Sequence, residues 1–246
     1  MPWRDNLDPY WIVVSEIMLQ QTQVPRVLIK FAEFIEKFPT WEVLAVASQA
    51  DVLRAWQGLG YNRRALFLKR MSARVVAEHG GILPRDPELL VEFPGIGNAT
   101  AASVAAYAYN MPTVFIETNV RSVFIHHFFK DQTDVDDKEL FPLVASALDK
   151  KNPREWYWAL MDYGTHLKAE NKNPARRSAH HVKQSKFVGS LRQARGAVLR
   201  ALAVSPKTVL AIQKESGIEK ERILKAVEGL QKEGFIVVRG KQLLLA

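Results

Sequence analysis

Phe93-Pro94-Gly95-Ile96-Gly97 separates two stretches with helical periodicity, and this short turn decides the fold prediction. Asp86-Pro87 is a typical helix start, so we expect a short helix over residues 87–93. The small apolar residues after the turn predict a second helix over residues 98–109. The glycines let the backbone approach a ligand closely, and the free N–H groups that open the second helix suit a phosphate. The alternative is a purely structural turn in a helical bundle.

Nearly all of the chain before residue 170 has helical periodicity, with almost no strand signals. A second pair of glycines, in Gly58-Leu59-Gly60-Tyr61, predicts another tight turn between helices. After a linker-like stretch over residues 170–174, the pattern changes to three helices and two short strands. This order is typical of a winged-helix domain, which we place at residues 190–246. Such domains bind DNA or dock proteins, and the sequence favours neither. The expected helices cover residues 9–21, 24–38, 41–47, 49–57, 63–78, 120–129, 137–148, 154–167, 192–204, 207–216 and 219–233, and the strands residues 235–238 and 242–245.

The composition excludes several classes of protein. With 48% hydrophobic residues, the 246-residue chain is not disordered. It has no cysteine, which excludes disulfides, zinc–thiolate sites and cysteine-ligated iron–sulfur clusters. No long apolar run or signal-like start is present, so we expect no membrane contact and a soluble, cytoplasmic, nucleoid-associated protein.

The net charge of +8 indicates a polyanionic partner. Basic residues gather between positions 168 and 186, where Glu170 is the single acid. This stretch is either a DNA-contacting segment or a solvated basic loop. Its basic residues are Lys168, Lys172, Arg176, Arg177, Lys183 and Lys186.

Two glutamates stand in apolar surroundings. Glu16 lies in a predicted helix that is apolar nearly all round. Burial would raise its pKa and keep it protonated near neutral pH, as a general acid requires. The alternative is a helix-edge glutamate that faces water. Glu117 ends the apolar run over residues 113–116 and precedes a helix, so it either complements the helix dipole or faces a developing positive charge.

Taken together, these segments resemble the MutY-type adenine DNA glycosylases of the helix–hairpin–helix (HhH-GPD) superfamily, which also includes endonuclease III. The resemblance covers about residues 2–167, and its most specific part is Ser15–Val24. It implies a mainly α, two-lobed glycosylase domain at residues 1–185. The six-helix lobe would span about 15–107, and the second lobe 1–14 and 108–185. The other matching segments are Pro2-Trp3-Arg4, Asp8-Pro9-Tyr10, Gly58–Tyr61 and Pro94–Gly97.

The resemblance also implies roles for individual residues. Glu16 matches the general acid, Glu117 the aspartate that stabilises a cationic sugar, and Asn119 its helper. Gln21 and Tyr61 match residues that wedge into the base stack of DNA from which the target nucleotide is flipped. The main-chain carbonyls of the hairpin would hold a structural sodium or potassium ion through Val91, Phe93 and Ile96. The full DNA-binding set is predicted as Gln20, Gln21, Tyr61, Arg63, Gly95, Gly97, Asn98, Thr100, Arg176 and Arg177.

This chain departs from the family pattern in several ways. Glu117 replaces the usual aspartate, which adds one methylene. Ala99 stands where bifunctional relatives have a nucleophilic lysine, so we expect no lyase activity. The four cysteines of the [4Fe–4S] cluster are missing, with Lys168 near the first position, so no cluster is expected and residues 171–185 must fold without it. We expect neither the family's first helix nor its 8-oxoguanine-recognition domain. Histidines that could bind a substitute metal are His166, His180 and His181.

The sequence therefore predicts a monofunctional DNA glycosylase of base excision repair. It would hydrolyse the N-glycosidic bond of a mispaired or damaged base, with adenine favoured. One alternative is a uracil or thymine glycosylase at guanine mismatches, and another is a non-catalytic mismatch- or damage-binding protein. The expected partner is double-stranded DNA with such a base, bound by a monomer.

Overall fold

The computed structural model describes residues 1–170 and 173–246, so Asn171 and Lys172 of the basic linker lie outside the described residues. The chain forms two compact units. The first unit consists of Met1–Ile17 and Ile82–Lys183, and the second of Met18–Gly81 and Gln184–Ala246. This division assigns residues 82–107 to the first unit, whereas the predicted six-helix lobe includes them. The predicted domain limits stay a prediction.

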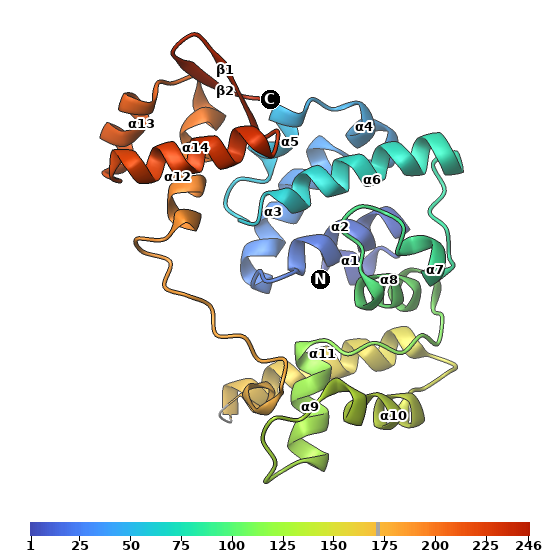
Figure 1. Cartoon of the computed structure of the whole chain (residues 1–246). Coiled ribbons are helices and arrows are strands. Elements are labelled where there is room, and N and C mark those ends of the chain that lie inside the picture. Colours follow the sequence, from blue (N-terminus) through green and yellow to red (C-terminus); the bar gives the residue numbers. More distant parts are fainter. Residues whose placement is uncertain (171–172) are drawn as a thin grey trace. The chain divides into compact units, whose positions relative to one another are not determined.

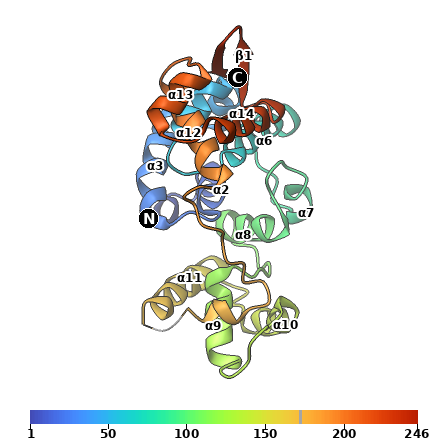
Figure 2. The same ribbon diagram turned by 60° about the vertical axis from the view of Figure 1, so that its left-hand side comes forward.

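Helices make up almost all of the regular structure of the first unit (Figure 1). Helix α9 packs against both α10 and α11, as Figure 2 also shows, and α8 packs against α7 and α11. Asp136 forms a capping box at the start of α10, which fixes that helix end by two side-chain hydrogen bonds. The elements are α1 (Pro2–Asp5), most of α2 (Pro9–Leu19), α7 (Pro87–Leu90), α8 (Asn98–Tyr109), α9 (Thr118–Phe128), α10 (Asp137–Ala147), α11 (Pro153–Glu170) and the 3-10 helix η1 (Pro174–Arg177).

The second unit combines a helical part with the C-terminal segment. Thr40 and Ser48 cap α4 and α5 with their hydroxyl groups, as expected for helix N-caps. Helix α6 packs against α4 and α5 through a buried face that includes Leu68 and Met71. The elements are α3 (Val24–Lys37), α4 (Trp41–Val46), α5 (Gln49–Ala55), α6 (Arg63–His79), α12 (Leu191–Val204), α13 (Val209–Ser216), α14 (Lys220–Lys232), β1 (Ile236–Arg239) and β2 (Gln242–Leu245).

Residues 190–246 have the predicted winged-helix layout. Strands β1 and β2 pair antiparallel, with Ile236 opposite Leu245, and Lys207 forms a further bridge with Leu243. Within the second unit this segment packs against α5, where Arg54 donates to the carbonyl of Ala203. Among the described residues, no helix is both long and apolar enough to cross a membrane.

Candidate active site

Glu16 lies on α2 and reaches α8, where it accepts a hydrogen bond from Ser103. The Ser103 Oγ to Glu16 Oε2 distance is 2.6 Å, and the same hydroxyl lies 3.0 Å from the carbonyl of Thr100. Three neighbours of Glu16 on α2, Ile12, Val13 and Ile17, are buried, whereas Leu19 is partly exposed. Glu16 itself is only partly buried, so its carboxyl group stands at the edge of the apolar core rather than inside it.

Glu117 is the N-cap residue of α9, but its side chain makes no capping hydrogen bond. The extended segment before it is fixed by Tyr157 of α11. The Tyr157 hydroxyl accepts from the amide of Phe115 and donates to the carbonyl of Thr113, and its ring stacks on Phe115 at 3.8 Å between centroids. The carboxylate of Glu117 is therefore not used to cap α9, and tertiary contacts hold the backbone before it in place.

The two glutamates form an electrostatic pair. Burial, and then repulsion by Glu117, raise the pKa of Glu16 to about 8, against a smaller lowering by the Ser103 hydrogen bond. Burial also raises the pKa of Glu117, but the positive charges of Arg121 and Lys168 oppose that effect. The cations lie on the side of Glu117, so Glu16 is the member of the pair that holds a proton near neutral pH.

Asn119 is the second residue of α9, and side chains of α11 contact it. Lys168 Nζ donates to Asn119 Oδ1 at 2.5 Å, and Asn119 Nδ2 lies 3.5 Å from Met161 Sδ. A Cβ on Gly164 would come within 2.7 Å of the Asn119 carbonyl oxygen. The glycine is thus required for α11 to pass this close to Asn119. The structure brings Glu16, Glu117 and Asn119 into one cluster and adds Lys168, to which the sequence analysis gave no role there.

The turn Phe93–Gly97 lies between α7 and α8 as predicted, and its two glycines differ in backbone conformation. Gly95 has a φ of +83°, whereas Gly97 has an extended backbone and caps α8. Phe93 and Ile96 are buried and anchor the turn, while Gly95, Gly97 and Asn98 are exposed. The predicted phosphate-binding backbone is therefore accessible, and Thr100 lies in the same first turn of α8. Of the three carbonyls predicted to bind a cation, those of Val91, Phe93 and Ile96, the Phe93 oxygen accepts from the Ile96 amide at 3.2 Å.

The predicted wedge residues lie together in the second unit. Gln21 and Tyr61 have φ values of +55° and +45°, a left-handed conformation that is unusual for residues other than glycine. Gln184 donates to both, at 3.3 Å to Gln21 Oε1 and 3.0 Å to the Tyr61 hydroxyl. Such local strain is typical of functional positions. The structure thus brings together two residues that are 40 positions apart in the sequence.

Arg64 fixes both of these turns. It is buried, donates to the carbonyls of Met18, Gln20 and Gly60 at 2.5 to 3.2 Å, and stacks on the ring of Tyr61. Burial lowers the pKa of Arg64 to about 10. The backbone of the predicted DNA contact Gln20 is therefore part of this anchor. Arg64 was not predicted from the sequence, although it directly follows Arg63 and lies four residues after Gly60.

Comparison with known proteins gives the family. A family model described as "HhH-GPD superfamily base excision DNA repair protein" matches residues 14–143, more than half of the chain. The chain belongs to the HhH-GPD superfamily. The match includes Glu16, the hairpin and Glu117, so these residues lie in the part of the chain that defines the family.

Curated relatives point to one branch of the HhH-GPD superfamily. The chain is 44% identical over 124 residues to an adenine DNA glycosylase from Mycobacterium tuberculosis, which covers 50% of this chain and 41% of the relative. It is 34% identical over 176 residues to the human adenine DNA glycosylase, which covers 67% of this chain and 32% of the relative. The predicted MutY-like membership is confirmed, and the chain spans less than half the length of these relatives.

Solved structures confirm the fold. A thermostable thymine-DNA glycosylase matches with a TM-score of 0.59 and 25% identity, over 67% of this chain and 77% of that one. An endonuclease III from a non-covalent DNA complex matches with a TM-score of 0.54 and 18% identity, over 65% of this chain and 72% of that one. The second likeness concerns the fold alone.

A [4Fe–4S] cluster does not fit the residues of this HhH-GPD chain. There is no cysteine to supply a thiolate, and Lys168, near the first expected cysteine position, donates to Asn119 instead. Among the described residues, no group of three histidine or acidic side chains could hold a metal ion, which gives the substitute-metal interpretation of His166, His180 and His181 no support. His166 instead pairs with Glu170 at 3.2 Å.

Arg177 and a β-bridge at Ser178 tie the chain after η1 to α9 and to the segment before α10. The guanidinium of Arg177 donates to the carbonyls of Ile125, Phe129 and Lys130, which closes the C-terminal end of α9. Val135 pairs with Ser178 as a parallel bridge.

The three arginines predicted to contact DNA differ in whether their guanidinium groups already bind other parts of the protein. Arg177 is committed to main-chain carbonyls, whereas Arg176 is exposed. Arg63 pairs with Glu233 at 2.8 Å. Of the three, Arg176 alone forms no ion pair or side-chain hydrogen bond with the described residues, and all three DNA contacts stay predictions.

Proposed function

We propose that this chain is a monofunctional DNA N-glycosylase of base excision repair that releases adenine from a mispair. The carboxyl pair Glu16 and Glu117 is the observation that carries this proposal. One member is held protonated by burial, and the other faces two cations. This asymmetry is what acid-assisted cleavage of a glycosidic bond requires.

In the proposed mechanism Glu16 donates its proton to a ring nitrogen of the flipped base. Protonation makes the base a neutral leaving group, and the N-glycosidic electron pair departs with it. The sugar becomes an oxocarbenium-like cation, which the carboxylate of Glu117 stabilises electrostatically. Water then adds to C1′ and loses its proton to a carboxylate, which leaves an abasic site. Asn119 orients this water or the sugar, and Ala99 at the exposed start of α8 offers no amine for strand cleavage.

Several features support double-stranded DNA as the partner. The exposed hairpin backbone offers N–H groups to a phosphate, and Gln21 and Tyr61 stand together as wedges. The similarity to adenine DNA glycosylases favours adenine as the released base. We further propose that the enzyme works without an iron–sulfur cluster and as a monomer.

Thymine opposite guanine is the second candidate substrate, because a thymine-DNA glycosylase shares the fold with 25% identity. A thymine glycosylase has less use for a protonated Glu16, since a pyrimidine offers no equivalent basic ring nitrogen on its leaving edge. Release of adenine should therefore depend more strongly on a protonated Glu16 than release of thymine does.

A panel of duplex oligonucleotides tests the proposal. It contains adenine opposite 8-oxoguanine, guanine and cytosine, and thymine or uracil opposite guanine. We expect alkali-sensitive sites in the adenine mispairs, with no strand break before alkali. Cleavage of the thymine or uracil duplexes alone would replace adenine as the substrate, and strand breaks before alkali would contradict the monofunctional mechanism. Tight mismatch binding without base release under single-turnover conditions would favour a non-catalytic protein.

A further inference from the structure

The two units of the chain differ strongly in charge. The second unit holds 21 of the 34 lysines and arginines but only 10 of the 26 acidic residues. The first unit holds 13 basic and 16 acidic residues, although it carries the proposed catalytic carboxylates. Attraction of the DNA polyanion must therefore come mainly from the second unit.

Within the winged-helix domain most acids are already neutralised. Glu215 pairs with Lys207, Glu219 with Arg222, and Glu233 with Arg195. Only Glu221 and Glu228 among the five acids of residues 190–246 form no ion pair with described residues. Seven exposed basic side chains of this domain likewise form no ion pair there, namely Arg200, Lys214, Lys220, Lys225, Lys232, Arg239 and Lys241.

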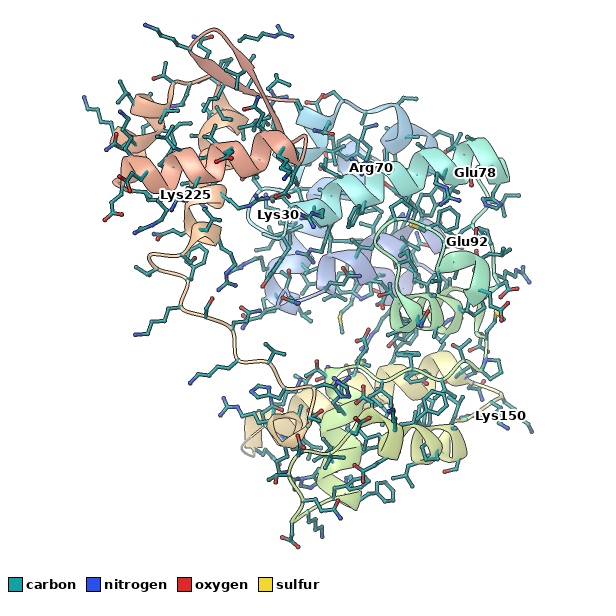
Figure 3. The ribbon with its side chains drawn as sticks, viewed as in Figure 1. Lys30, Arg70, Glu78, Glu92, Lys150 and Lys225 are labelled. Carbon is teal, nitrogen blue, oxygen red and sulfur yellow. The ribbon has the colours of Figure 1, made fainter. Side chains whose placement is uncertain are left out.

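Five of these seven cations lie on α14, the third helix of the domain, or at the turn between β1 and β2, and Lys232 is the last residue of that helix. Lys220 and Lys225 are on α14, where Figure 3 labels Lys225, and Arg239 and Lys241 flank Gly240 at the turn between β1 and β2. We propose that α14 and this turn bind the phosphates of duplex DNA and supply much of the chain's electrostatic affinity for it. Glu221 and Glu228 are exposed on the same helix, which favours sequence-independent phosphate contacts over base recognition.

The proposal for this surface rests on the proposed function, but its test measures DNA binding and not base release. The test variant replaces Lys220, Lys225, Arg239 and Lys241 with glutamine. A matched control replaces four exposed lysines of the first unit that form no ion pair with described residues, and it removes the same charge. They are Lys130, Lys138, Lys150, which Figure 3 labels, and Lys151. Binding to an undamaged duplex is measured by fluorescence anisotropy at several KCl concentrations, and thermal unfolding confirms that both variants fold.

We expect the test variant to bind at least about tenfold more weakly than the control. The slope of log Kd against log salt should fall by about three to four, since each lost phosphate contact removes close to one unit. An equal loss of DNA affinity in both variants would show a net-charge effect and would overturn the proposal that this surface binds DNA. Unchanged DNA binding in the test variant would also overturn the proposal and would favour an acidic protein as the partner of these cations. If the wild-type chain binds no duplex at all, the proposed function itself fails.

A different observation carries a second proposal, on Lys168. This residue is partly buried on α11, and its amine lies 2.5 Å from Asn119 Oδ1. The other cation near Glu117 is Arg121, but its guanidinium is already paired with Asp137 through contacts of 2.6 and 2.7 Å. Lys168 has no such acidic partner among the described residues, so its charge acts on Glu117.

We propose that Lys168 is a positioning residue that aims Asn119 and keeps Glu117 the ionised member of the carboxyl pair. The charged and titratable groups around Glu117 are Glu16 on α2, Tyr107 on α8, Arg121 on α9 and Lys168 on α11. Glu16 disfavours ionisation of Glu117, and Tyr107 is neutral because burial raises its pKa far above neutrality. Lys168 is therefore the cation near Glu117 whose charge is not already paired with another acid among the described residues.

Lys168→Met and Lys168→Arg form the test, read as single-turnover base release from pH 5 to 9. Loss of the cation raises the pKa of Glu117, so the acidic limb of the rate profile should move up by about one pH unit in the methionine variant. The arginine variant keeps the charge and should restore both the limb and most of the rate. A methionine variant that is slower by the same factor at every pH, or an arginine variant without rescue, would overturn this role. An inactive wild-type chain would instead overturn the proposed function.

Discussion

Glu16→Gln is expected to slow base release by about 10²- to 10⁴-fold, because glutamine accepts the Ser103 hydrogen bond but has no proton to give. In the wild-type chain the acid is protonated below a pH of about 8, so the rate should fall as the pH rises through that value. The glutamine variant should lose this basic limb. Single-turnover kinetics on the preferred mispair, from pH 5 to 9, measure both effects.

Ser103→Ala is the matched control for this variant. It removes the hydrogen bond from the carboxyl group but leaves the acid in place, so the rate should fall by no more than about tenfold. A Glu16→Gln variant that keeps the wild-type rate and pH profile would remove Glu16 from the mechanism.

The same substitution should make the fold more stable near neutral pH. The pKa of Glu16 is raised from 4.5 in the unfolded chain to about 8 in the folded one. Below pH 4.5 both states are protonated and there is no penalty. Between pH 4.5 and 8 only the unfolded state ionises, so the free energy of unfolding falls as the pH rises, and above 8 the loss is complete. Glutamine removes this loss, a gain of about 2 kcal/mol at pH 7 after allowance for partial solvent exposure. A loss of activity with a higher Tm would exclude misfolding as its cause.

The long elements were predicted well, because most helices bury one apolar stripe and the small apolar residues of α8 are buried on every side. Helix α8 and strand β2 have the predicted bounds, and most other ends differ by a few residues. The four-residue helices α1 and η1 were missed, since a single turn has no periodicity to detect. Helix α7 is also shorter than expected, ending at Leu90 rather than at residue 93, because the chain already turns towards Gly95.

The site could be predicted only where the chemistry is local or the family pattern marks it. Glu16 and Glu117 stood out by their apolar neighbours and by the resemblance. Lys168 and Gln184 contact Asn119 and Tyr61 across 49 and 123 positions of the sequence, and no local pattern reveals such partners. Arg64 combines local contacts to Gly60 and Tyr61 with a contact across 42 positions. Charge alone also does not show what an arginine contacts. The guanidinium of Arg177 donates to a main-chain carbonyl at the end of α9, and its predicted DNA contact stays a prediction.

The family pattern has aspartate where this chain has Glu117, and a series at this position is expected to show the second large effect. Glu117→Gln keeps the length and removes the charge that would stabilise the cationic sugar. We expect a rate loss of about 10³-fold or more, since electrostatic stabilisation in a partly desolvated site is the largest single contribution to such catalysis. The loss should appear in the single-turnover rate and not in the affinity for the mispair.

Glu117→Asp separates the charge from its position. It restores the residue that the family pattern expects but withdraws the carboxylate by about one bond length, where it could cap α9 as aspartate often does. Because Tyr157 and Lys168 hold the surrounding backbone and Asn119, the site cannot follow this change. We expect a loss of about 10²-fold, smaller than that of the glutamine variant. An aspartate variant faster than the wild type would mean that the site still has the family's geometry and that Glu117 limits its rate, whereas equal rates in all three proteins would deny the carboxylate any role.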